Sequence, residues 1–189
     1  MTALEKYIQS YFGIPIDDLQ KISSFFELVK LKKGDFFLKS GRISDRLGFV
    51  QSGIVREFVY ADGKEITKWI STEGYFTVDL SSFVFQQPSR WNIHALTDAD
   101  VYVIKYADYK QIGQIIPRWQ ELEKLFITRC FNILEERIMT HLSMTAEERY
   151  QHFHNFNPAL FNQVPLQYLA SMLGMTPETF SRIRKKTMH

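Results

Sequence analysis

The sequence predicts an α+β fold in which a series of short antiparallel strands lies between two helical regions. From about residue 27 to 105, short runs of β-branched and aromatic residues alternate with turn residues at intervals of roughly ten residues. Seven or eight such strands, flanked by turns, are typical of a barrel or sandwich. On either side of this stretch, apolar residues instead recur every three or four positions, which indicates helices.

The composition indicates a globular protein and excludes several kinds of cysteine site. The chain has 189 residues, 45% of them hydrophobic, which is sufficient for a sizeable core. No apolar run approaches the roughly 18 residues of a membrane span, and the first residues lack the apolar stretch of a signal peptide, so we expect a cytoplasmic protein without a membrane partner. The single cysteine, Cys130, excludes an internal disulfide, a zinc ribbon and a four-cysteine iron-sulfur site.

The first helical region is a lead-in over residues 3–25, interrupted by Gly13 and Pro15. Among the strands that follow, residues 54–60 are the clearest. Asp62 and Gly63 come directly after them, and this pair favours the positive φ values of a tight hairpin turn.

A long helix is predicted from Pro117 to about Ser143, because proline suits a first helical turn. Its apolar stripe consists of Leu122, Leu125, Phe126, Ile133, Leu134, Ile138 and Leu142. A stripe of this length indicates packing against another helix or a second subunit, although a helix packed wholly on its own barrel would show the same pattern. A second helix is expected from Thr145, as its cap, to about Phe156, with Asn157 and Pro158 ending it.

Residues 164–186 predict two short helices that meet at a tight turn. The first opens at Pro165 and runs through Leu173, and Gly174 supplies the left-handed conformation that ends a helix. Thr176 caps the second helix, which begins at Pro177. The predicted inward-facing residues are Leu169, Ala170, Met172, Leu173, Phe180 and Ile183.

The outward face of the second helix carries groups that suit DNA. Glu178 and Arg182 are four residues apart and therefore share a face, where arginine can bond guanine bidentately and glutamate can accept from cytosine. Thr176 and Thr179, at the helix start, suit phosphate. Residues 164–189 carry four basic residues and one acidic residue, within a chain whose net charge is +2. A solvated basic terminus and an ordinary surface ion pair on an amphipathic hairpin remain the alternative interpretations.

Three stretches resemble the Crp/Fnr family of bacterial regulators, from about residue 15 to the end. The first comprises the glycine turns of a β-roll: Leu31-Lys-Lys-Gly-Asp-Phe-Phe, Phe49-Val-Gln-Ser-Gly-Ile-Val-Arg and Asp62-Gly-Lys-Glu. The second is Gly74-Tyr-Phe, followed by Arg90-Trp-Asn-Ile-His-Ala, at the family's phosphate-binding cassette. The third and most specific is Gln167-Tyr-Leu-Ala-Ser-Met-Leu-Gly-Met-Thr-Pro-Glu-Thr-Phe-Ser-Arg-Ile, which is close to the family's helix-turn-helix.

The resemblance implies a cyclic-nucleotide-binding-like, jelly-roll-like β-roll with N-terminal helices at residues 1–116, a long dimerisation helix at 117–143 and a helix-turn-helix domain at 144–189. Because the sequence ends at His189, we expect no complete β-hairpin wing. The implied partners are double-stranded DNA, RNA polymerase and a second copy of the chain. The DNA-binding residues are predicted to be Thr176, Glu178, Thr179, Ser181, Arg182, Lys185 and Lys186. Pro177 stands where many members carry a further, basic base-reading residue, so the preferred DNA sequence should differ.

The phosphate-binding cassette departs from the pattern of members that bind cyclic AMP. Those members use a Gly-Glu pair for the ribose and an Arg-Ser pair for the cyclic phosphate, whereas this chain has Val78-Asp79 and Ser89-Arg90. We therefore expect the roll either to bind an unidentified small-molecule effector other than cyclic AMP or to serve only as a scaffold. The predicted effector pocket comprises Phe76, Asp79, Leu80, Ser89, Arg90 and Trp91.

Two other classes of function are the alternatives to a DNA-binding regulator. A ligand-binding or scaffold protein could use the helical hairpin to contact the transcription machinery without reading DNA. An enzyme has little support, because the sequence contains no nucleophile-base pair, phosphate loop or closely spaced metal-ligand motif. His152 and His154 are two residues apart, so they do not share a helix face as metal ligands would. We expect neither a cofactor nor a metal.

Overall fold

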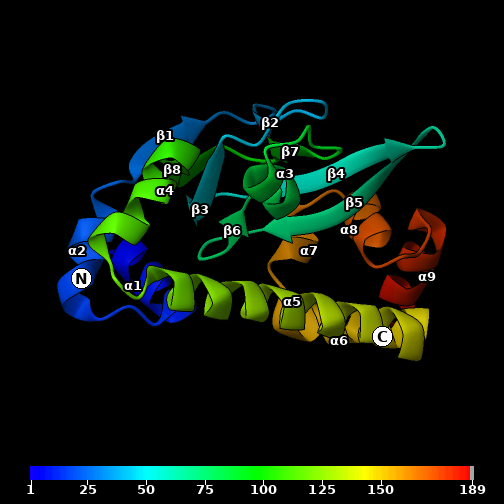
Figure 1. Ribbon diagram of the computed structural model, residues 1–189. Coiled ribbons are helices and arrows are strands. Elements are labelled where there is room, and N and C mark those ends of the chain that lie inside the picture. The colour runs from blue at the N-terminus through cyan, green and yellow to red at the C-terminus, as the bar shows by residue number, and fades with distance from the viewer. Residues whose placement is uncertain (188–189) are drawn as a thin grey trace. The chain divides into compact units, whose positions relative to one another are not determined.

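The computed structural model describes residues 1–187 and begins with the predicted helical lead-in (Figure 1). Helix α1 spans Ala3–Phe12 and α2 spans Ile16–Ser23. Thr2 caps α1 through a reciprocal pair of hydrogen bonds with Glu5, and Gly13 ends it in the left-handed conformation. Met188 and His189, the last residues of the predicted C-terminal domain, lie outside the described residues.

Eight strands within residues 1–187 form two four-stranded sheets, which confirms the predicted β-roll. One sheet has the order β1-β8-β3-β6 and the other β2-β7-β4-β5. The registered strand pairs are antiparallel. The strands are β1 Glu27–Leu31, β2 Phe36–Leu38, β3 Arg46–Ser52, β4 Val55–Ala61, β5 Lys64–Ser71, β6 Phe76–Thr77, β7 Asn92–Ala95 and β8 Ala99–Lys105.

Two turns show why particular residues are needed in the roll. Asp62 and Gly63 join β4 to β5 with φ values of 49° and 72°, the double positive φ that the sequence predicted for this hairpin. Gly53 has a φ of 85°, and a Cβ there would lie 2.4 Å from the carbonyl oxygen of Asp98. Any larger residue at position 53 would therefore displace the neighbouring turn.

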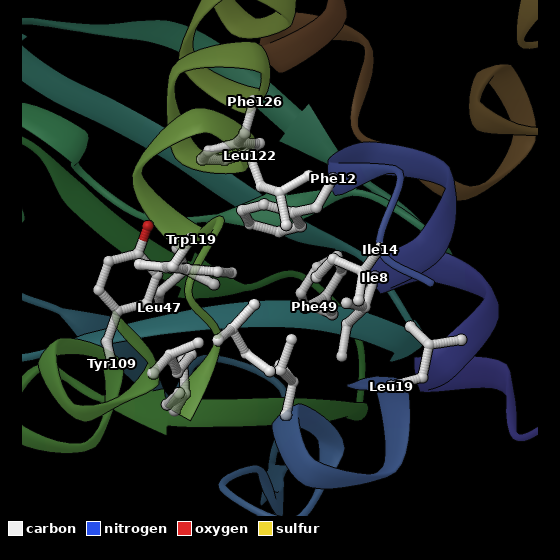
Figure 2. Close-up of a cluster of buried hydrophobic side chains, with 14 of the residues drawn as sticks. Ile8, Phe12, Ile14, Leu19, Leu47, Phe49, Tyr109, Trp119, Leu122 and Phe126 are labelled. Carbon is white, nitrogen blue, oxygen red and sulfur yellow. The ribbon is translucent and has the colours of Figure 1, made fainter. Parts of the chain in front are cut away.

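An aromatic core joins the lead-in helices to the roll (Figure 2). Phe12 stacks on Phe126, with ring centroids 4.7 Å apart, and on Trp119 at 5.1 Å. Phe49 of β3 is fully buried in the same cluster. A second cluster is built from apolar residues of the strands, and on β8 its members alternate, with Val101 and Val103 buried. The core thus fixes α1, α2 and the start of the long helix against the roll.

The remaining helices are α3 Leu80–Phe85, α4 Tyr106–Ile115, α5 Trp119–Ser143, α6 Ala146–Phe156, α7 Leu160–Gln163, α8 Leu166–Met172 and α9 Pro177–Thr187. The predicted long helix is present, but it begins at Trp119, because Pro117 and Arg118 form a turn ahead of it. The sequence analysis did not predict α3 or the four-residue α7. Thr145 caps α6 as predicted.

The chain divides into two compact units. The first contains Met1–Glu57 and Ile70–Cys130, and the second contains Phe58–Trp69 and Phe131–His189. The outer part of the β4–β5 hairpin therefore belongs to the same unit as the C-terminal helices, and α5 is shared between the two units. Among the described residues, the helices are too short or too polar to span a lipid bilayer.

The predicted apolar stripe of α5 separates into two faces. Leu122 and Phe126 are buried in the core of the first unit. A second row is exposed, and four of its members recur with alternating spacings of four and three residues, the spacing of a coiled-coil seam. This row, here called the α5 seam, consists of Ile127, Phe131, Leu134, Ile138 and Leu142. Ile127 and Phe131 belong to this row but were not among the residues of the predicted stripe.

Candidate nucleic-acid interface

The turn between α8 and α9 has the geometry that the sequence predicted. Gly174 has a φ of 66°. The amide of Gly174 donates to the carbonyl of Ser171 at 3.1 Å, and that of Met175 donates to the carbonyl of Ala170 at 3.0 Å. These two hydrogen bonds form a Schellman motif, which satisfies the last carbonyls of α8 and reverses the chain. Two short helices are thereby held at a fixed angle.

Helix α9 is anchored by an aromatic cluster and its own cap. Phe180 is fully buried, 5.1 Å from the ring of Tyr150 on α6 and 5.7 Å from that of Phe161 on α7. The Thr176 hydroxyl accepts from the amide of Thr179 at 3.2 Å, which caps the helix. The anchor therefore comes from helices outside the two-helix motif and includes α7.

Arg149 of α6 supports the turn through a partly buried set of hydrogen bonds. The Arg149 guanidinium donates to the carbonyl of Leu173 at 2.9 Å and to that of Met144 at 2.7 Å. The charge-assisted bond to Leu173 compensates an unsatisfied acceptor at the end of α8. Arg149 thus ties the turn to the end of α5, and its role was not predicted.

The predicted DNA-binding residues lie on the outside of this rigid motif. Thr176, Glu178, Arg182 and Lys185 are exposed, and Thr179 and Ser181 are half-buried. The pKa of Glu178 is held below its usual value by a hydrogen bond from the residue's own backbone amide and by one from the Thr176 side chain. The Glu178 side chain is therefore a carboxylate near neutral pH. The ion pairs found among the described residues do not join Glu178 to Arg182, so the surface-ion-pair interpretation loses its basis.

Lys186 differs from the other predicted phosphate-binding residues because it already has an anionic partner. Its Nζ lies 3.0 Å from both carboxylate oxygens of Glu147 on α6. The lysine is largely exposed, so this ion pair is weak and exchangeable with solvent ions. Its contribution to phosphate binding would require that pair to open.

The outer part of the β4–β5 hairpin contacts α8, a feature that the sequence did not indicate. The amide of Thr67 donates to the Ser171 hydroxyl at 2.9 Å, and that hydroxyl donates to the Glu65 carbonyl at 3.2 Å. Arg137 of α5 donates to the carbonyls of Lys68 and Met172, and its guanidinium lies over the Trp69 ring. The hairpin, α8 and α5 are thereby connected through two polar side chains.

A cleft of about 710 Å³ lies between the hairpin and the helix-turn-helix within this unit. Its hairpin wall is formed by Lys64, Glu65 and Ile66. Residues of α8, the turn and the first turn of α9 form the opposite wall: Gln167, Tyr168, Ser171, Gly174, Met175, Thr176, Pro177 and Glu178. The start of the candidate reading helix therefore faces the hairpin.

The residues of the predicted effector pocket have varied surroundings in the first unit. Phe76 and Leu80 pack against the aromatic core. Asp79 is 5% exposed and accepts from the amide of Ser82, which caps α3. The Ser89 hydroxyl accepts from the Trp91 amide, and the exposed Arg90 guanidinium lies 4.7 Å from the Trp91 ring centroid. All six side chains thus have local contacts within the first unit.

Comparison with known proteins gives the domain family and the fold. Residues 28–115 match the family described as the cyclic nucleotide-binding domain. This stretch covers β1 apart from Glu27, β2 to β8 and all of α4, so it coincides with the roll. The chain has the fold of a Crp/Fnr-type regulator. The predicted fold class is confirmed, and so is the predicted resemblance at the level of the fold.

Solved structures establish the fold of this chain over most of its length. FixK2 from Bradyrhizobium japonicum has a TM-score of 0.71 at 16% identity and covers 86% of this chain and 84% of its own. CLP from Xanthomonas campestris, a c-di-GMP responsive global regulator, has a TM-score of 0.70 at 15% identity over 92% of both chains. The catabolite activator protein of Thermus thermophilus has a TM-score of 0.59 at 19% identity, with coverages of 96% and 86%. A search of curated protein sequences finds no match.

Proposed function

We propose that this chain is a homodimeric bacterial transcription regulator that reads double-stranded DNA with α9. The observation that carries the proposal is the pair Glu178 and Arg182, both exposed on one face of a helix whose opposite face is fixed by buried Phe180. In helix-turn-helix proteins the N-terminal residues of the second helix contact base edges in the major groove. Arg182 is assigned to a guanine and Glu178 to a cytosine.

The remaining polar residues of α9 are assigned to the DNA backbone. Thr176, Thr179 and Ser181 offer hydroxyl groups close to the helix start, where backbone amides also favour phosphate. Lys185 and Lys186 supply cationic charge towards the C-terminal end. Contacts of this kind position the protein without specifying sequence, so they account for affinity and its salt dependence.

The α5 seam supports the proposal of a homodimer. Its five apolar side chains are exposed in the single chain, and their spacing suits left-handed packing against a second α5 helix. A two-fold dimer would present two α9 helices to successive major grooves about 34 Å apart, on a roughly palindromic site. Bound there, the dimer would recruit or block RNA polymerase in the cytoplasm.

The roll is proposed to sense an effector other than cyclic AMP or to act as a scaffold. Asp79 aligns with the ribose-binding position of the cassette. It is buried, and its carboxylate accepts a hydrogen bond from the Ser82 amide at the start of α3 instead of facing a ligand. A thermal-shift assay with cyclic AMP should therefore show no stabilisation. The cyclic dinucleotide c-di-GMP, to which the similar protein CLP responds, serves as a second probe. A cyclic-AMP-dependent rise in Tm would contradict this part of the proposal.

Selection of bound duplexes from a random library tests the function directly. The purified chain should enrich a palindromic consensus, and a Glu178→Ala, Arg182→Ala variant should lose that consensus while keeping its fold and self-association. Lys124→Ala, another exposed helical cation, is the matched control and should keep the consensus. Enrichment that survives in the double variant, or no enrichment at all, would instead favour a scaffold that contacts the transcription machinery without reading DNA.

A further inference from the structure

We propose that the outer β4–β5 hairpin is an autoinhibitory clasp, which competes with DNA for the start of α9. The inference rests on the proposed DNA-reading function and names how that site is regulated. Its basis is the pair of hydrogen bonds at Ser171 together with the cleft that Lys64–Ile66 share with Thr176–Glu178.

The dimensions of the major groove make the two arrangements incompatible. A helix with its side chains is about 10–12 Å across, and the major groove is about 12 Å wide, so α9 would fill the groove. Glu178 and Thr176 cannot line a cleft with the hairpin and also lie against base edges and phosphates. The hairpin must therefore withdraw before the start of α9 enters the groove.

The charge of the cleft also disfavours a phosphate strand. Its charged side chains are Lys64, Glu65 and Glu178, one ammonium and two carboxylates. The carboxylates would repel phosphate oxygens unless the hairpin moved and took Glu65 with it. The bond between Thr67 and Ser171 closes the α8 side of the cleft, so a DNA strand cannot pass through it while the clasp is formed.

Covalent connectivity gives the clasp a route to the roll. Strands β4 and β5 continue past Glu57 and Ile70 into the first unit. Any event in the roll that shifts these two strands would change how often the clasp is formed. Only molecules whose hairpin is withdrawn would bind DNA. The apparent affinity of the free protein would therefore equal the intrinsic affinity multiplied by the fraction of such molecules.

The test removes the clasp without changing α9. Ser171→Ala deletes one acceptor and one donor and replaces serine by a better helix former, so α8 should remain folded. Loss of these two bonds should raise the affinity for a fluorescein-labelled duplex about tenfold, measured by anisotropy at fixed salt. Ser143→Ala, which removes a hydroxyl bonded only within α5, is the matched control and should leave affinity unchanged.

Hydrogen exchange at the Thr67 amide provides a second readout in the unmodified protein. If DNA displaces the hairpin, saturating duplex should accelerate exchange at Thr67, and Ser171→Ala should do so without DNA. Slower or unchanged exchange upon DNA binding, or equal affinities of Ser171→Ala and the unmodified chain, would overturn the clasp while leaving DNA reading intact. If neither protein bound any duplex, the proposed function itself would be wrong, and the inference with it.

Discussion

Shortening two side chains of the α5 seam should dissociate the proposed dimer. Phe131 is 58% exposed and Ile138 is 57% exposed in the single chain. Burying such a side chain completely contributes about 1.5–3 kcal/mol, so covering the exposed half contributes roughly 1–1.5 kcal/mol. A two-fold dimer covers four of these side chains, or about 4–6 kcal/mol. The Phe131→Ala, Ile138→Ala variant should therefore raise the dimer Kd by about a thousandfold to ten-thousandfold.

Sedimentation velocity over a range of protein concentrations measures this shift. The unmodified chain should sediment as a dimer at micromolar concentration, whereas the double variant should sediment as a monomer with an unchanged circular dichroism spectrum. Leu125→Ala is the control, because Leu125 is 49% exposed but lies two residues from Ile127 and so on another side of the helix. A double variant that remained as dimeric as the Leu125→Ala control would refute the assignment of the seam.

Three further predictions concern stability, reactivity and salt. Gly174→Ala should lower the free energy of unfolding by about 1–2 kcal/mol, because it places a Cβ in a left-handed turn, 3.2 Å from the His141 ring. Urea titrations measure this change, and unchanged stability would contradict the turn geometry. Burial raises the pKa of the Cys130 thiol to about 11, so at pH 8 only about one thiol in a thousand is ionised. Iodoacetamide should therefore modify Cys130 slowly until the chain is denatured. Rapid labelling of the folded protein would contradict the burial of this thiol. DNA affinity should fall steeply between about 50 and 200 mM salt in anisotropy titrations, because Arg182, Lys185 and Lys186 replace counterions; a salt-insensitive Kd would argue against phosphate contacts.

Local chemistry explains which parts of the fold could be predicted. The hairpin at Asp62-Gly63 and the turn at Gly174 require positive φ, and few residues accept it, so each leaves a clear mark in the sequence. The capping threonines Thr145 and Thr176 leave similar marks, because a helix start needs a side-chain acceptor. These signals depend on a few neighbouring residues and so can be identified without knowledge of the tertiary structure.

Features that depend on contacts between distant parts of the chain were not predicted, because neighbouring residues carry no signal for them. Helix α7 has only four residues, too few for an apolar period, and is stabilised by the packing of Phe161 on Tyr150 and Phe180. The clasp joins Thr67 to Ser171, 104 positions apart, through a backbone amide that no sequence pattern marks.

The α5 seam was predicted only in part. Apolar residues surround much of this helix, and its two apolar faces overlap in the sequence. Only the structure shows that Leu122 and Phe126 are buried in the core while Phe131 is exposed. The predicted stripe therefore combined residues from a buried face and an exposed face of the same helix.

The central claim is that α9 reads bases, and replacement of one guanine tests it most directly. In the selected duplex, substituting 7-deazaguanine at the position assigned to Arg182 removes the N7 acceptor without altering base pairing. This replacement should weaken binding of the unmodified chain by about 1–3 kcal/mol and leave that of an Arg182→Ala variant unchanged. Equal losses for both proteins at every guanine of the site would contradict base reading by Arg182.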